Sequence, residues 1–260
     1  MLTRGLQAAL LGAKTAARRF APAPAWRSLQ IGRAWLRRRV SLRPVNLGQL
    51  RRVTPVSRQW GADRGQPIDR FYIEAFLREQ ALDIRGRVLE VRDDTYIRQF
   101  GGDRVTQRDV LHVVPGNPQA TIVADLTSAA HVPSDIFDCI IMTQTLHLIY
   151  DVGAALRTLH RILKPGGVLL ATLPGISHVS RRDMERWGDC WRFTTMSARR
   201  LLAESFHEDV SIRSYGNVLA AVAFLHGLAT EEFRRDELEH ADADYQVIIA
   251  ARAVKRPSGA

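Results

Sequence analysis

The first 62 residues contain no aspartate or glutamate. They hold thirteen arginines and lysines, whereas the whole chain of 260 residues has a formal net charge of +10. The rest of the chain is therefore slightly acidic, and the basic character belongs to the N-terminal region. A slightly acidic domain lacks the extended phosphate-binding face of a nucleic-acid enzyme, so we expect no specific nucleic-acid partner.

Cysteine, lysine and long apolar runs are also scarce. Neither Cys139 nor Cys190 belongs to a CxxC pair, which argues against a disulfide framework or a metal site and favours a reducing, cytoplasmic compartment. Only three of the 37 basic residues are lysines, a usage that indicates a GC-rich bacterial genome. The longest apolar stretch, residues 218–228, is shorter than the roughly 20 residues of a membrane span.

Residues 1–54 are predicted to form a basic N-terminal extension. APAPA, residues 21–25, ends an amphipathic helical pattern whose apolar face comprises Leu2, Leu6, Leu10, Ala13, Ala17 and Phe20. Such a segment can lie on anionic lipid, which gives the protein a peripheral place at the inner membrane, or act as a phosphate-binding arm. An Arg-rich leader without a specific partner is the alternative, and the composition also permits a transit peptide.

Residues 55–254 show the pattern of an α/β domain, followed by a short tail at 255–260. Helical patterns, of which 151–164 is the clearest, alternate with strand patterns at 88–91, 105–113, 120–126, 137–144 and 168–174. Two more strand patterns follow at 209–215 and 245–254. This alternation predicts a Rossmann-like, seven-stranded, mostly parallel sheet with helices on both faces.

Sheets of this kind bind ligands beyond the carboxyl ends of their strands. The polar residues at or near those ends are therefore the candidates for a site. They are Glu90, Asp93, Asp109, Asp125, Thr143 and Gln144.

One long segment resembles a known family. FDCIIMTQTLHLIYDVGAALRTLHRILKPGGVLLATLPG, residues 137–175, is similar to the strand-four to strand-five region of class I S-adenosylmethionine-dependent methyltransferases. RWGDCWRFTTMSARRLLAESF, residues 186–206, further resembles type 11-like methyltransferase domains found near glycosyltransferases in polysaccharide gene clusters. The resemblance implies S-adenosylmethionine as the cofactor and a small molecule or a glycan as the acceptor of the methyl group.

The stretch RVLEVRDDTY, residues 87–96, departs from that family. Its strand is normally followed by a loop of the type E-x-G-x-G-x-G, whose glycines let the backbone approach the cofactor. Arg92 and Asp94 stand where the family commonly has glycine. The chain is therefore either a methyltransferase with an altered loop or a pseudoenzyme of that fold, serving as a binding or scaffold partner of a glycosyltransferase.

The resemblance also implies roles for particular residues. It gives cofactor contacts to Glu90, Asp93, Asp109, Asp125, Leu126, Thr143 and Gln144. Asp109 is expected at the end of the second strand, where it can bind ribose hydroxyls, and Asp125 near the adenine amino group.

His147 follows the fourth strand and is the candidate catalytic base for a hydroxyl acceptor. A histidine packed under the next helix is the alternative. Aromatic and arginine side chains after the fifth strand suit a sugar ring or an anionic acceptor. These candidates are Arg181, Trp187, Trp191 and Arg192. The tryptophans can equally serve to hold the loop against the sheet.

Overall fold

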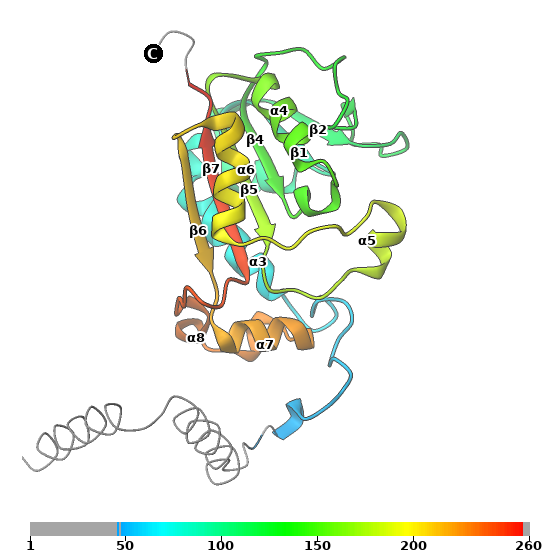
Figure 1. Ribbon diagram of the computed structural model, residues 1–260, viewed down its shortest axis with the longest axis vertical. Helices are drawn as coiled ribbons and strands as arrows, with labels where there is room; N and C mark the ends of the chain where they lie inside the picture. The colour runs from blue at the N-terminus through cyan, green and yellow to red at the C-terminus, as the bar shows by residue number, and fades with distance from the viewer. Residues whose placement is uncertain (1–45, 47, 257–260) are drawn as a thin grey trace, which may run out of the picture. The chain divides into compact units, whose positions relative to one another are not determined.

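The structure is a computed structural model that describes residues 46 and 48–256 (Figure 1). The chain divides into two units, Met1–Arg51 and Arg52–Ala260. In the first unit the described residues include the 3₁₀ helix η1, Gly48–Leu50. The amphipathic helix expected within residues 2–20 lies outside the described residues.

The second unit alternates helices and strands. Its strands are β1 (Gly86–Val91), β2 (Val105–His112), β3 (Ile122–Val123), β4 (Phe137–Thr143), β5 (Leu163–Pro174), β6 (Val210–Tyr215) and β7 (Ile248–Val254). Its α-helices are α3 (Ile68–Glu79), α4 (Val152–Ile162), α5 (Arg181–Arg186), α6 (Thr195–Phe206), α7 (Val218–His226) and α8 (Arg235–Glu239). Short helical turns are η2 (Ala81–Asp83), the π-helical η3 (Ile97–Gly101), η4 (Gly102–Arg104), η5 (Leu146–Leu148) and η6 (Thr230–Glu232).

The seven strands form one sheet in the order β3-β2-β1-β4-β5-β7-β6. Strand β7 runs antiparallel to both of its neighbours, and the other pairs are parallel. Val88 pairs with Cys139, so β1 and β4 are adjacent central strands. The predicted mostly parallel sheet is confirmed.

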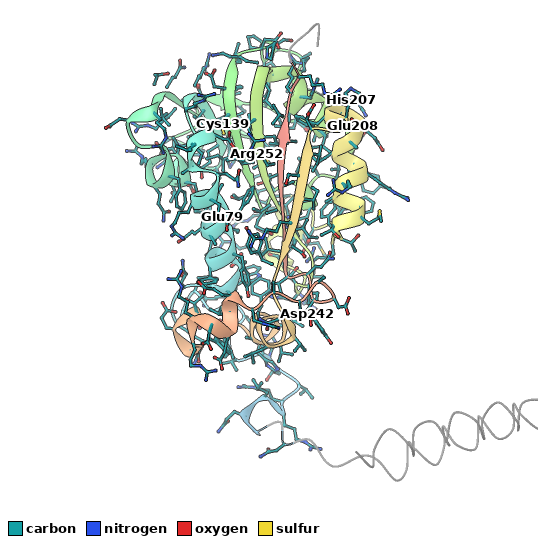
Figure 2. The ribbon with its side chains drawn as sticks, turned by 90° about the vertical axis from the view of Figure 1, so that its left-hand side faces the viewer. Glu79, Cys139, His207, Glu208, Asp242 and Arg252 are labelled. Atoms are coloured by element: carbon teal, nitrogen blue, oxygen red, sulfur yellow. The ribbon has the colours of Figure 1, made fainter. Side chains whose placement is uncertain are left out.

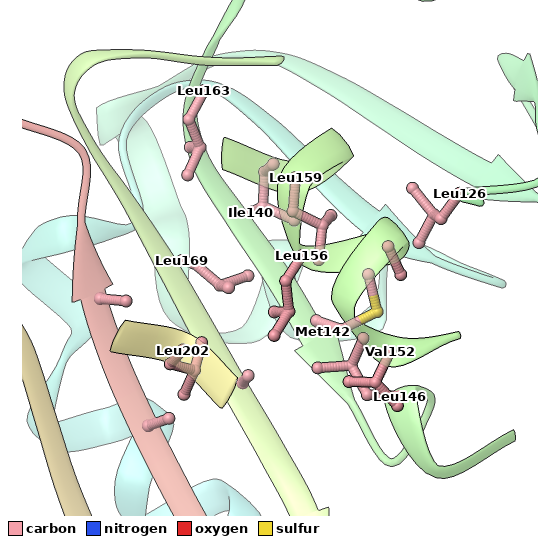
Figure 3. Packing of buried hydrophobic residues seen from close by; sticks show 14 of the residues in the cluster. Leu126, Ile140, Met142, Leu146, Val152, Leu156, Leu159, Leu163, Leu169 and Leu202 are labelled. Atoms are coloured by element: carbon pink, nitrogen blue, oxygen red, sulfur yellow. The ribbon is translucent and has the colours of Figure 1, made fainter. Parts of the chain in front are cut away.

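The apolar residues of the amphipathic pattern form the buried face of helix α4. Asp151 caps its first turn, because the Asp151 carboxylate accepts a hydrogen bond from the Ala154 N–H at 2.8 Å. Apolar residues at helical spacing then form one buried face against the sheet (Figure 3). Leu156 and Leu159 are almost completely buried in it. Replacing either by alanine is expected to cost about 2–5 kcal/mol of stability.

Helices cover both faces of the sheet. Helices α4 and α6 lie on the face turned toward the viewer in Figure 1 and share one buried cluster with the sheet. Helices α3 and α7 contribute to a second cluster on the opposite face, which includes Tyr72 and Phe76. The predicted helices on both faces are therefore confirmed.

Several predicted strand boundaries are wrong, most clearly those of β3 and β5. Strand β3 covers only Ile122–Val123 instead of 120–126, because its only ladder is two residues long, with β2. Strand β5 begins at Leu163, five residues before the predicted start, because Leu163 already pairs with Phe137. Residues 165–167 thus form an irregularity within the strand, where Gly166 has a φ of +80°.

Candidate active site

The strand order places a topological switch point between β1 and β4. From β1 the chain builds the sheet outward through β2 and β3, whereas β4 and β5 extend it in the other direction. The connections that leave β1 and β4 therefore diverge, and ligands of open α/β sheets bind at such a switch point. Residues at the carboxyl ends of β1, β2, β3 and β4 converge there.

The loop after β1 contains a left-handed turn, a conformation typical of glycine, at a residue that is not glycine. Arg92 has a φ of +81°, in the left-handed region that costs a non-glycine residue about 1–2 kcal/mol. Hydrogen bonds hold this turn: the Arg92 N–H donates to the Leu111 carbonyl at 2.9 Å, and Asn117 Nδ2 donates to the Arg92 carbonyl at 2.6 Å. The side chain of Arg92 is 79% exposed, so it points away from the packed interior. The backbone conformation that glycine favours is thus kept.

Glu90 holds the backbone on the far side of this turn. Its side chain is buried, and its two carboxylate oxygens accept the backbone N–H groups of Tyr96 at 3.2 Å and Ile97 at 2.9 Å. Burial raises the pKa of Glu90 to about 8, although the two backbone hydrogen bonds oppose the shift. Both oxygens thus accept hydrogen bonds from the backbone after the turn, so Glu90 stabilises the loop and does not face a ligand.

Asp109 lies elsewhere than expected. It pairs with Leu89 in the middle of β2, three residues before the strand ends. The residue is 4% exposed, and its carboxylate accepts hydrogen bonds from Arg87 Nε at 2.7 Å and Thr121 Oγ1 at 2.9 Å. The prediction that Asp109 ends β2 is wrong, because cross-strand partners bury it inside the sheet.

The end of β2 instead carries His112. Its Nδ1 lies 2.7 Å from the Val114 carbonyl, and its ring meets the Trp187 ring edge-to-face at a centroid distance of 5.6 Å. The contact brings the segment after β5 to the carboxyl end of β2. Of the four tryptophan and arginine candidates, Trp187 thus reaches the carboxyl end of β2.

Asp125 lies just beyond β3, as expected. It is exposed, and its Oδ1 accepts hydrogen bonds from the Thr127 N–H and Oγ1, both at 2.8 Å. Both bonds use the same oxygen, which leaves Oδ2 available to a ligand. The side chain of Leu126 belongs to the buried cluster shown in Figure 3, so only its backbone can face a ligand.

The remaining predicted cofactor residues surround the ends of β1 and β4. Asp93 accepts a hydrogen bond from the Thr95 N–H at 3.1 Å. Thr143 ends β4, and its carbonyl accepts a hydrogen bond from Thr145 Oγ1 at 2.8 Å. Gln144 turns the chain with a φ of +44°, while its N–H donates to the Thr172 carbonyl at 3.0 Å.

His147 lies in η5, directly after the end of β4. Two backbone N–H groups, of Cys190 and Trp191, donate to its carbonyl at 2.9 and 3.2 Å. Its Nδ1 is buried without a hydrogen-bond partner. Burial lowers the pKa of His147 to about 4, against the opposing effect of the Asp189 carboxylate. The imidazole is therefore neutral at pH 7, and its lowered pKa makes it a weaker base than an ordinary histidine.

We call residues 176–192 the lid segment, which follows β5 and contains α5. Arg192 donates from Nη1 and Nη2 to the Asp189 carboxylate at 2.5 and 3.0 Å, and Asp189 also accepts the Ser180 N–H at 2.7 Å. Trp191 Nε1 donates to the Ile149 carbonyl at 3.2 Å. Arg192 and Trp191 therefore hold the lid segment in place, the second of the two roles expected for the tryptophans.

Arg181 and Trp187 remain exposed on or next to α5, which projects from the body of the domain in Figure 1. Sequence reasoning did not single out Asp189, whose side chain is 1% exposed and anchors the lid segment. The only sequence signal for it was an acidic residue three positions before an arginine.

A cavity of about 200 Å³ lies away from these residues, between α3, β6 and β7. Figure 2 shows Glu79 and Arg252, two of the residues that line it. Its charged groups are paired, since Arg213 binds Glu79 at 2.9 Å and Arg252 binds Asp83 at 2.7 Å. None of the predicted site residues lines this cavity.

Two further points concern the described residues alone. No group of three or more His, Cys, Asp or Glu side chains in them is arranged to hold a metal ion. None of their helices has the length and apolar character needed to cross a membrane.

Residues 96–210 match a methyltransferase domain. The match covers less than half of the chain and begins directly after the Arg92–Thr95 turn, so the altered loop lies outside it. No curated protein matches the chain.

Solved structures with a similar fold include a SAM-dependent methyltransferase from Archaeoglobus fulgidus. It is 11% identical, covers 72% of this chain and 94% of its own, and has a TM-score of 0.48. Another is the N-methyltransferase NodS from Bradyrhizobium japonicum WM9 in complex with S-adenosyl-L-homocysteine. It is 15% identical, covers 80% of this chain and 95% of its own, and has a TM-score of 0.47.

The geometry of the strand ends fits S-adenosylmethionine at two places. The backbone at Arg92 has the left-handed conformation that glycine favours, and Asp125 has a free carboxylate oxygen for an amino group. A third place differs, because His112 stands at the end of β2, where a ribose-binding acid was expected. The residues around β1, β3 and β4 can therefore hold the cofactor, with the ribose contact altered.

Proposed function

We propose that this protein is an S-adenosylmethionine-dependent methyltransferase that acts on a small-molecule or glycan acceptor. The observation that carries the proposal is the φ of +81° at Arg92. A strained conformation that costs about 1–2 kcal/mol persists only where surrounding contacts impose it. Here it preserves the shape of a cofactor loop after the residues that normally give that shape have been replaced.

The chain's own residues have separable tasks in this proposal. Glu90 braces the turn, and Asp125 Oδ2 accepts a hydrogen bond from the adenine amino group. Bound S-adenosylmethionine supplies an electrophilic methyl group. His147 takes the proton that a hydroxyl acceptor loses, although its lowered pKa makes it a weak base. The lid segment, fixed by Asp189 and Arg192, limits access of water to these groups.

A specific observation favours a second candidate. His112 replaces an acid at the end of β2, and Trp187 packs against it. A protein that has lost its ribose contact can serve as a scaffold or binding partner of a glycosyltransferase and catalyse nothing. The two candidates differ in whether the purified protein binds the cofactor.

Calorimetric titration with S-adenosylmethionine and S-adenosylhomocysteine tests the proposal. Asp125→Ala leaves the adenine amino group without its partner, so binding is expected to weaken by about one to two orders of magnitude. Asp103→Ala is the matched control, because Asp103 is an exposed acid in η4, before the opposite end of β2. Arg92→Gly is expected to leave binding unchanged or tighter. Absence of binding in the wild-type protein contradicts the methyltransferase proposal and favours the scaffold.

We also propose that residues 1–54 bring the protein to anionic membrane surfaces. The thirteen basic residues up to residue 62 face no acid in the same stretch of sequence. Electrostatic attraction of this kind is weakened by salt.

A further inference from the structure

Three buried polar atoms without hydrogen-bond partners lie in and under the lid segment. They are Nδ1 of His147, Nδ1 of His178 and Nε of Arg192. Buried polar atoms in folded proteins are nearly always paired, and an unpaired one costs free energy. Of the other two such atoms among the described residues, one belongs to Tyr215 and one to His226.

Backbone contacts hold these three side chains near one another. Arg192 Nη2 donates to the carbonyl of His178 at 2.6 Å. The two N–H groups directly before Arg192 donate to the carbonyl of His147. Both imidazoles also lie close enough to the Asp189–Arg192 ion pair for its charges to affect their pKa. The three side chains therefore lie around one ion pair, and we call them the polar cluster.

The ring of His178 is fixed from two sides. It stacks on Trp60 with a centroid distance of 5.0 Å and an interplanar angle of 25°, and Phe224 of α7 lies at 6.4 Å. Trp60 has a φ of +56°, a strained conformation for a large side chain. Segments far apart in the sequence thus position an imidazole whose Nδ1 binds nothing in the chain.

The charges of the cluster cancel. The Arg192 guanidinium is paired with the Asp189 carboxylate, and burial lowers the pKa of both His147 and His178, which keeps them neutral at pH 7. An anion entering the cluster would lose its hydration without meeting a net positive charge. A hydroxyl group can donate one hydrogen bond and accept two, so it can satisfy an Nε–H donor and an imidazole nitrogen of either tautomer.

We propose that these three atoms bind the hydroxyl groups of a neutral, hydroxyl-rich acceptor such as a sugar ring. The proposal rests on the methyltransferase function and narrows its acceptor class. Trp187 and Trp191, 38% and 39% exposed, offer aromatic faces for a sugar in the same lid segment.

Nuclear magnetic resonance of the isotope-labelled full-length protein tests this site without the cofactor. The histidine ring signals are followed while methyl α-D-glucopyranoside is added to one sample and inorganic phosphate to another. The signals of His147 and His178 are expected to shift saturably with the glucoside and to stay in place with phosphate. Binding of S-adenosylhomocysteine, measured on the same preparation, reports the proposed function separately.

Variants locate the site. His178→Phe keeps an aromatic ring against Trp60 but removes Nδ1, so glucoside binding is expected to weaken about tenfold. His160→Phe is the matched control, since His160 also contacts an aromatic ring, that of Phe206 at 5.0 Å, and lies in α4. Glucoside without any shift, equal shifts with phosphate, or equal weakening by His160→Phe each overturns the proposal. The wild-type titrations decide alone if His178→Phe does not fold.

Discussion

Replacing Arg92 by glycine is expected to make the protein slightly more stable. Arg92 adopts a φ of +81°, which costs about 1–2 kcal/mol for a residue with a Cβ. Glycine removes that cost, but it also lowers stability by about 0.5–1 kcal/mol, because the unfolded chain has more conformational freedom at a glycine. The lost side chain contributes little, because it is 79% exposed and its ion-pair contact with Asp93 is 3.9 Å long. The net gain is therefore between zero and about 1.5 kcal/mol.

Urea unfolding of the two proteins measures this difference as a shift of the transition midpoint. Arg157→Gly is the matched control, because Arg157 is an exposed arginine within α4 at a negative φ. That variant is expected to lose about 1 kcal/mol, as glycine does within a helix. Equal losses in both variants would refute the reasoning, since they would show that the turn at Arg92 carries no strain.

Three further predictions concern the loop, the lid segment and the N-terminal extension. The raised pKa of Glu90 means that the fold binds its proton more tightly than the unfolded chain, so stability falls as pH rises from about 4.5 to about 8. Glu90→Gln should flatten that part of the stability profile in urea unfolding, and an unchanged profile would assign it to another group. Asp189→Ala leaves Arg192 unpaired at a cost of about 3 kcal/mol, which should speed tryptic cleavage of the lid segment far more than Asp183→Ala does. Removing residues 1–54 should leave the melting temperature nearly unchanged and abolish salt-sensitive binding to anionic vesicles; a truncated protein that fails to fold would contradict this.

The sequence predicted the layout of the sheet well because that layout follows from local periodicity. The apolar runs around Val88 and Ile140 and the amphipathic residues of α4 indicated buried strands and a covering helix, and the structure has all three. Asp125 was placed correctly beyond β3 even though the strand is much shorter than predicted.

Side chains with distant partners could not be placed in this way. Asp109 looked like the end of a strand, but Arg87 on the neighbouring strand and Thr121 bury it within the sheet. The contact between His112 and Trp187 joins positions 75 residues apart, which no local pattern signals. The sequence did not predict the left-handed turn at Arg92, because arginine rarely adopts that conformation.

A crystal structure of the full-length protein with S-adenosylhomocysteine tests most directly whether the altered loop still holds the cofactor. The account predicts the ligand at the carboxyl ends of β1, β3 and β4, with its adenine amino group hydrogen-bonded to Asp125. The Arg92 backbone should keep its positive φ while its side chain stays clear of the ligand. A ligand bound elsewhere, or held by the Arg92 guanidinium through an anionic group, would contradict the account.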